Sequence, residues 1–181
     1  MNGFQKWSEV IQHIEAEQLG FDDGKMKISG DQFVADINLI AQRIPETYLQ
    51  NKKMSNQGIA LWIHQLSHMK MGTNYAGVPI LHALADAIRL VSPLPGSKEL
   101  FKILHTDYGM FLQLQATYFI GKHIRVTGVE QEKGRVDIVA EVGGKTLNVH
   151  VKNTQPFTKE LAQLMAVAFI NQALILMVRS F

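Results

Sequence analysis

The chain has 181 residues, a net charge of +2, 46% hydrophobic residues and no cysteine. This length suits one domain, or one core with a helical subdomain, and the hydrophobic content excludes a disordered chain. The absence of cysteine excludes disulfides and thiolate metal sites, and the near-neutral charge excludes nucleic-acid binding driven by charge alone. Residues 101–181 hold 9 Lys and Arg against 6 Asp and Glu, so a polyanion would favour that part of the chain.

Neither end of the chain predicts a membrane segment. Residues 1–10 are too polar for the apolar core of a secretory signal. The most apolar stretch, Leu164 to Val178, is shorter than the roughly 20 residues that cross a bilayer. We therefore expect a cytoplasmic protein that does not associate with membranes.

The first half of the chain predicts helices, because apolar residues recur there at helical spacing. Gly20, the Asp22-Asp23-Gly24 turn and Pro45 separate the first segments, and Pro79 is suited to the first turn of a later helix. Ser55-Asn56-Gln57 offers an N-cap before the third segment. The four apolar stripes are Phe4, Trp7, Ile11 and Ile14; Phe33, Ile37, Ile40 and Ile44; Ile59, Trp62, Ile63 and Leu66; and Ile80, Leu84 and Ile88.

The run Ser92-Pro93-Leu94-Pro95-Gly96 breaks the helical pattern and predicts a boundary between a helical subdomain, residues 1–95, and a second unit, residues 96–181. Ser97 is expected to cap a helix that contains Leu100 and Leu104. Residues 107–120 favour a further helix, and from Lys122 the apolar period changes to two. The predicted class is therefore α+β.

A β-hairpin is predicted where Gly143-Gly144 joins two alternating runs, residues 135–142 and 145–152. Tight hairpin turns require positive φ, which glycine adopts readily. If Val142 pairs with Lys145, Asp137 lies opposite His150 and Arg135 lies opposite Lys152.

The two-residue period then separates an apolar face from a polar face of the hairpin. Asp137, His150 and Lys152 share the polar face, and directly opposed residues have Cβ atoms about 4.5–5.5 Å apart. These side chains could hold a metal ion or a substrate phosphate together. The alternative is an ordinary solvated face, which antiparallel hairpins commonly have.

The sequence around the hairpin resembles the Mrr-type branch of the PD-(D/E)XK nuclease-like superfamily. The resemblance is carried by Gly134-Arg135-Val136-Asp137-Ile138-Val139-Ala140-Glu141, followed by the glycine turn and by Val149-His150-Val151-Lys152. It covers residues 97–181 and implies a restriction-endonuclease-like α-β-β-β-α-β core. The expected first strand covers His123 to Glu130, and a helix at residues 158–170 and a strand at 173–178 would complete the core.

The resemblance also implies an activity, metal-dependent cleavage of phosphodiester bonds, with Mg²⁺ or Mn²⁺ as cofactor and nucleic acid as partner. It places Asp137 as a metal ligand and Lys152 as the residue that stabilises developing charge. His150 stands where the family has Glu, Asp or Gln, and imidazole suits transition metals better than Mg²⁺. The site is therefore either degenerate, adapted to Mn²⁺, or completed by Glu141 as a second metal carboxylate. Further polar candidates are Glu99, Asp107 and Gln163.

The six apolar residues 173–178 cannot alternate, which predicts a strand covered on both faces and reached by a parallel crossover. An OB-like barrel over residues 122–181 is the alternative fold and would not contain this crossover.

Other patterns suggest other functions. His64 with His68, and His82 with Asp86, have the i,i+4 spacing of helical metal ligands. A non-catalytic adaptor is the alternative to a nuclease, because Trp7 and Trp62 in a near-neutral half of the chain suit a protein partner. A homo-oligomer is also left open.

Overall fold

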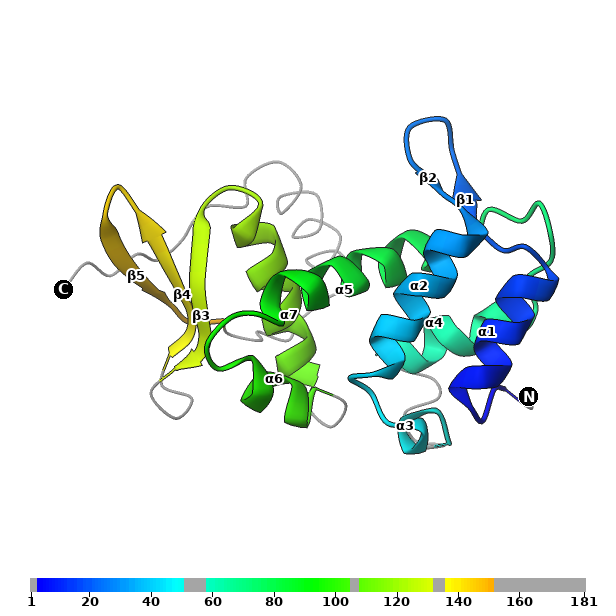
Figure 1. Cartoon of the computed structure of the whole chain (residues 1–181), viewed down its shortest axis with the longest axis horizontal. Coiled ribbons are helices and arrows are strands. Elements are labelled where there is room, and N and C mark those ends of the chain that lie inside the picture. The colour runs from blue at the N-terminus through cyan, green and yellow to red at the C-terminus, as the bar shows by residue number, and fades with distance from the viewer. Residues whose placement is uncertain (1–2, 51–57, 105–107, 132–135, 152–181) are drawn as a thin grey trace, which may run out of the picture.

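The computed structural model describes residues 3–50, 58–104, 108–131 and 136–151 of the chain. Helices dominate the first two thirds of the described residues, and a three-stranded antiparallel sheet follows them (Figure 1). The α+β class predicted from the sequence is confirmed. None of the helices in these ranges is long and apolar enough to cross a membrane.

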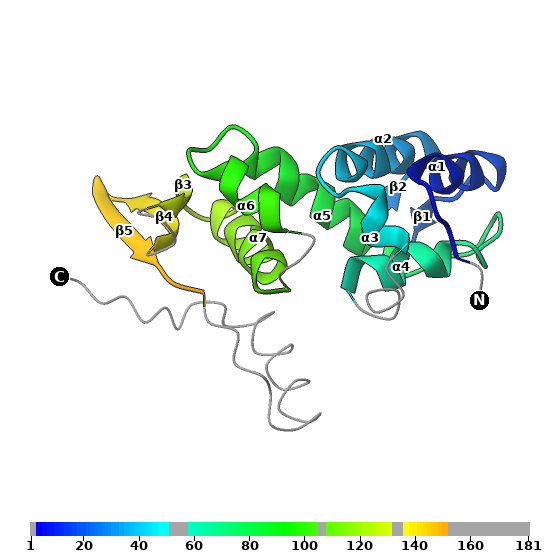
Figure 2. The same cartoon turned by 90° about the horizontal axis from the view of Figure 1, so that it is seen from below.

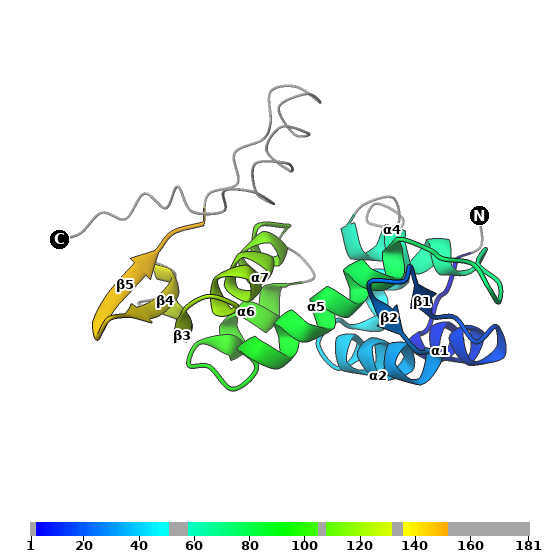
Figure 3. The ribbon, with the colours of Figure 1, turned by 90° about the horizontal axis from the view of Figure 1, so that it is seen from above.

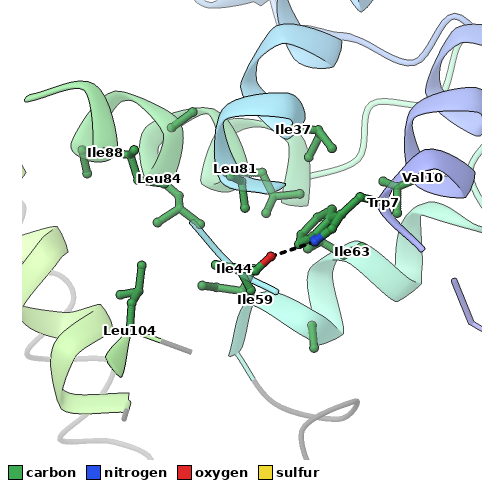
Figure 4. Packing of buried hydrophobic residues seen from close by; sticks show 14 of the residues in the cluster. Trp7, Val10, Ile37, Ile44, Ile59, Ile63, Leu81, Leu84, Ile88 and Leu104 are labelled. Carbon is green, nitrogen blue, oxygen red and sulfur yellow. Dashed lines mark hydrogen bonds between the residues drawn. The ribbon is translucent and has the colours of Figure 1, made fainter. Parts of the chain in front are cut away.

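The predicted helical half forms because its apolar stripes meet in one core. Helices α1 (Trp7–Ala16), α2 (Gly30–Ala41), α4 (Gly58–Leu66) and α5 (Gly77–Val91) pack together, with the short α3 (Glu46–Gln50) between α2 and α4. Figure 4 shows side chains of these helices interdigitating, and the Trp7 indole Nε1 donates a hydrogen bond to the Ile44 carbonyl at 2.8 Å. Burying this apolar surface is the main stabilisation of the half.

The helical half also contains a hairpin that the sequence patterns did not predict. Strands β1 (Phe21–Asp22) and β2 (Lys27–Ile28) flank the predicted Asp22-Asp23-Gly24 turn. Two-residue strands are too short to show alternation, so the turn was the signal available. The Asn74 side chain extends this small ladder, because its Oδ1 accepts the Asp22 backbone N–H at 3.0 Å.

Helix α5 joins the two halves of the molecule. It packs against α2 and α4 on one side and against α7 (Tyr108–Gly121) on the other. Figures 1 and 2 show α5 running between the α1–α4 helices and the α6–α7 pair, with the sheet at the far end from α1. The predicted break at Ser92 to Gly96 lies between α5 and α6 (Ser97–Ile103), and its Pro95 carbonyl accepts the Val129 N–H at 2.9 Å.

The predicted Ser97 cap of α6 is wrong by one residue. Gly96 occupies the N-cap position with φ +86°, a conformation that glycine adopts without strain, and Ser97 is the first helical residue. The Ser97 hydroxyl is buried and donates to the Ser92 carbonyl at 3.2 Å instead. It therefore fastens the turn between α5 and α6 rather than the helix start.

The three-stranded sheet has the order β3-β4-β5, with β3 at Arg125–Gln131, β4 at Val136–Val142 and β5 at Lys145–Val149. Both strand pairs are antiparallel, and Figure 3 shows β5 as the strand farthest from the helices. Gly143 and Gly144 form the turn with φ of +57° and +75°, and Val142 pairs with Lys145 as predicted. The expected first strand is confirmed two residues later than its predicted start, after a turn at residues 122–124.

The helix predicted at residues 158–170 and the strand predicted at 173–178 lie outside the described residues, so the parallel crossover stays a prediction. The same holds for the OB-like alternative, which needs two further strands in that region. The restriction-endonuclease-like completion of the core and the domain division at residues 95/96 are likewise still predictions.

Candidate active site on the β4–β5 hairpin

The predicted pair of Asp137 and His150 meets at the open end of the hairpin. The His150 Nδ1 lies 3.7 Å from the Asp137 Oδ2. The same carboxylate oxygen accepts the backbone N–H of Val151 at 2.7 Å. The β4–β5 ladder ends one step earlier, at Ile138 and Val149, so the Asp137 side chain holds the continuing chain where backbone pairing stops.

Along β4 the two faces differ as the alternation predicts, except that Val142, expected on the apolar face, is 45% exposed. Val136, Ile138 and Ala140 are buried toward the helices. The Asp137 side chain is 20% exposed and the His150 side chain 56% exposed. The pair is thus half-open to water, where a solute can reach it. Lys152 follows Val151 directly in the chain but lies outside the described residues.

Glu141, the second predicted metal carboxylate, is not brought to Asp137. It lies four residues along β4, a separation of about 13 Å at strand rise. It pairs instead with Arg125 of β3, with 3.5 Å between Nη1 and Oε2. A single metal ion does not span that separation, so the structure does not bring the two predicted metal carboxylates together.

Of the remaining polar candidates, the structure describes Glu99 alone, and it does not bring that side chain to the site. Glu99 lies in α6 with an exposed side chain, 3.9 Å from the Lys102 ammonium. Asp107 and Gln163 are outside the described residues.

Among the described residues, the donor set at the hairpin is one carboxylate and one imidazole. Mg²⁺ is commonly held by one or two carboxylates together with waters and substrate phosphates, so Asp137 fits that ion. Imidazole is a ligand of transition metals rather than of Mg²⁺. An ion at Asp137 would therefore need waters or substrate phosphates as its further ligands.

The helical metal site predicted from His64, His68, His82 and Asp86 does not form. Helix α4 ends at Leu66, so His68 is not on it, and the His64 ring bonds to the Leu49 carbonyl at 3.1 Å through Nε2. Among the described residues no group of three or more His, Asp or Glu side chains is arranged to hold a metal ion.

His82 and Asp86 do share one face of α5, but they belong to a network of ion pairs around the buried Asp36. The Asp36 carboxylate of α2 is fully buried and accepts Arg89 Nη2 at 2.6 Å and His82 Nδ1 at 2.7 Å. Asp86 accepts Arg89 Nη1 at 2.7 Å and lies 3.6 Å from His82 Nε2. Both ring nitrogens of His82 thus face carboxylates, which leaves neither nitrogen directed at a substrate.

The carboxylates of this network favour the charged form of Arg89. Burial by itself would lower the pKa of Arg89, but its hydrogen bonds and charge interactions with Asp36 and Asp86 outweigh that and raise the pKa. A shallow hollow of about 400 Å³ lies beside the network, lined by Asp86, Arg89, Leu90, Tyr118, Gly121 and Lys122. Asp86 and Arg89 are already paired with each other, and the Lys122 ammonium lies over the Tyr118 ring, 4.3 Å from its centroid. The network around Asp36 therefore ties α2 to α5.

One of the two tryptophans that suggested an adaptor surface is buried. Trp7 is 6% exposed and belongs to the core, so it cannot form a partner surface. Trp62 is half-buried and packs against the same core. A protein partner for the helical half stays a prediction.

Comparisons with protein-family models, with curated proteins and with solved structures found no match for this chain. The functional argument therefore depends on the residues and geometry of the hairpin.

Proposed function

We propose that the protein acts on nucleic acid as a metal-dependent, nuclease-like protein, with Asp137, His150 and Lys152 as its site. The observation that carries the proposal is the approach of the Asp137 carboxylate to the His150 ring, 3.7 Å apart on the hairpin face opposite the core. The Asp137 carboxylate accepts the backbone N–H of Val151, and Lys152 is the next residue in the sequence. The resemblance to the Mrr-type signature assigns these same positions.

A divalent ion, Mn²⁺ or Mg²⁺, would be held by Asp137 with His150 as its neighbour. When bound, such an ion polarises a phosphate oxygen and activates water. Within the chain, Asp137 supplies negative charge at a position anchored by Val151, and Lys152 supplies positive charge for a phosphate. The ion pair of Arg125 with Glu141, farther along the sheet, takes no part in the site.

His150 decides between two forms of the proposal. If the imidazole serves as a metal ligand, the protein cleaves nucleic acid with Mn²⁺. If it disables the site, the protein binds nucleic acid without cleaving it. Both forms place the same side chains against a phosphate backbone.

The test is cleavage and binding of DNA and RNA, single- and double-stranded, in Mg²⁺ and in Mn²⁺. We expect Asp137→Asn and Lys152→Ala to lower cleavage by at least about 100-fold, because each removes a charge used in the reaction. His150→Glu restores the family residue and should shift metal preference toward Mg²⁺. Glu141→Gln is the matched control, on the same face of β4 but outside the site, and should retain full activity.

The outcomes separate the two forms. Binding that depends on Lys152 but without cleavage supports the degenerate form, and gain of cleavage in His150→Glu would identify the imidazole as its cause. Cleavage that survives both Asp137→Asn and Lys152→Ala rejects the site. A wild-type protein that neither binds nor cleaves any of these nucleic acids rejects the function.

A further inference from the structure

Gln113 of α7 is a buried amide that reaches the strand carrying the candidate site. Gln113 is only 2% exposed, and its Nε2 donates a hydrogen bond to the backbone carbonyl of Asp137 at 2.7 Å. A buried amide without a hydrogen-bond partner is destabilising. The orientation of Gln113 is therefore coupled to the position of the Asp137 backbone.

Gln113 differs in this respect from the other buried polar residues among those described. Asp36 lies in the ion network, Ser97 donates to the Ser92 carbonyl, and Thr117 donates to the Gln113 carbonyl of its own helix at 2.8 Å. Gln113 instead links α7 to β4. Its neighbour Leu114 is buried and apolar, so packing alone does not require an amide at this part of the helix.

Asp137 is consequently held at two points. The amide of Gln113 binds its backbone carbonyl, and the N–H of Val151 binds its carboxylate. Because side chains alternate along β4, the buried Val136 and Ile138 point toward the helices while the Asp137 carboxylate points to the other face. The bond from α7 thus limits movement of the strand at the one residue whose carboxylate faces His150.

We propose that Gln113 is a positioning residue of the hairpin site, fixing the Asp137 backbone so that the carboxylate keeps its place beside His150 and Val151. The inference rests on the proposed function for its catalytic meaning. The positioning itself is a property of the folded chain and is measurable without substrate.

The experiment compares Gln113→Met with Asp137→Asn in full-length, ¹⁵N-labelled protein. Methionine has nearly the same length as glutamine but cannot donate the hydrogen bond. The readout is the Val151 backbone amide, its proton shift and its exchange with solvent, because that N–H donates to the Asp137 carboxylate. We expect both variants to move the Val151 amide in the same direction and to speed its exchange at least about tenfold, as expected when roughly 1.4 kcal/mol of protection is lost.

Thr117→Val is the matched control. It removes a buried hydrogen bond one turn along the same helix, without touching Asp137, and should leave the Val151 amide unchanged. An unchanged Val151 amide in Gln113→Met, or an equal change in Thr117→Val, overturns the proposal. If Gln113→Met does not fold, the wild-type protein supplies a second measurement. This is the NMR scalar coupling between Gln113 Nε2 and the Asp137 carbonyl carbon across their hydrogen bond. Its absence would also overturn the proposal.

A kinetic arm applies if the wild-type protein cleaves. Gln113→Met should then lower kcat by about 10- to 100-fold, as loss of an orienting group does at such sites, with KM within about twofold. If the wild type neither binds nor cleaves nucleic acid, the proposed function fails, while the Val151 readout still decides whether Gln113 positions Asp137.

Discussion

Two Asp–His contacts of the described residues, Asp36 with His82 and Asp137 with His150, differ in almost every physical respect. Asp36 and His82 meet between α2 and α5 at 2.7 Å, with the carboxylate fully buried and Arg89 as a third partner. Asp137 and His150 meet across a hairpin at 3.7 Å, with the ring more than half exposed. The shorter, better-paired contact is the poorer candidate for function, because its polar atoms are already satisfied. The looser pair keeps a side chain in water where a phosphate can approach.

The largest expected difference between the pairs is in stability. Asp36→Asn leaves Arg89 and His82 without their buried anion and should lower the free energy of unfolding by about 3 kcal/mol or more. Asp137→Asn weakens one hydrogen bond at the end of a strand and should cost no more than about 1.5 kcal/mol. Urea unfolding of both variants measures the two losses. Equal losses would mean that the hairpin pair is as structural as the helical pair.

Replacing the two histidines should give the same order of stability losses as replacing the two aspartates, but with smaller values. His82→Ala removes a hydrogen bond to a buried carboxylate and should cost about 1.5–3 kcal/mol. His150→Ala removes a half-exposed ring and should change stability by no more than about 0.5 kcal/mol. The measurement is again urea unfolding. A large loss in His150→Ala would assign the imidazole a role in holding the hairpin together.

The two pairs also differed in how far the sequence could predict them. The register that places Asp137 opposite His150 followed from a two-glycine turn and a period of two, both of which are local signals. The Asp36 network joins residues 46 and 53 positions apart, so no local pattern relates them. The i,i+4 spacing of His82 and Asp86 was visible, and Arg89 follows on the same helix, but the buried partner Asp36 depends on how α2 packs against α5.

The same reasoning explains the other successes and misses. Amphipathic stripes predicted α1, α2, α4 and α5, because burial of one helix face is a periodic property. The β1–β2 hairpin and α3 were missed because elements of two and five residues are too short to show a period. Gln113 was missed because it bonds to the backbone of a residue 24 positions away. A polar residue next to the apolar Leu114 was the one signal that could have marked Gln113 as a candidate for a buried hydrogen bond.

The turn that creates the hairpin pair offers a test of intermediate size. Gly144 has φ +75°, and a Cβ added there would meet no atom within 4 Å. Gly144→Ala should therefore cost about 1–2 kcal/mol through backbone strain alone, and Gly144→Asn should cost less. Gly24, with φ +80° and equally open space, is the matched position in the β1–β2 hairpin. Urea unfolding of the alanine and asparagine variants at both glycines measures the loss of unfolding free energy. If alanine and asparagine cost the same at Gly144 and at Gly24, backbone strain is not the cause.

The smallest expected effect concerns a carboxylate that is hydrogen-bonded yet fully exposed. Backbone N–H groups of Gln5 and Lys6 donate to Glu9 at the start of α1 and lower its pKa below 4.5. A lowered pKa in the folded state stabilises the protein above pH 4.5, and this contribution is lost as pH falls through the lowered value.

Glu9→Gln should therefore lower the melting temperature by about 1–2 °C at pH 6 and by less at pH 3, where more of the wild-type carboxyl is protonated. Glu15→Gln, an exposed change on the same helix, is the control and should show no such pH dependence. A Glu9→Gln difference that persists unchanged at pH 3 would mean that the charge of Glu9 contributes nothing. In that case, the carboxylates that stabilise this half through their charge would be those in an ion network, such as Asp36.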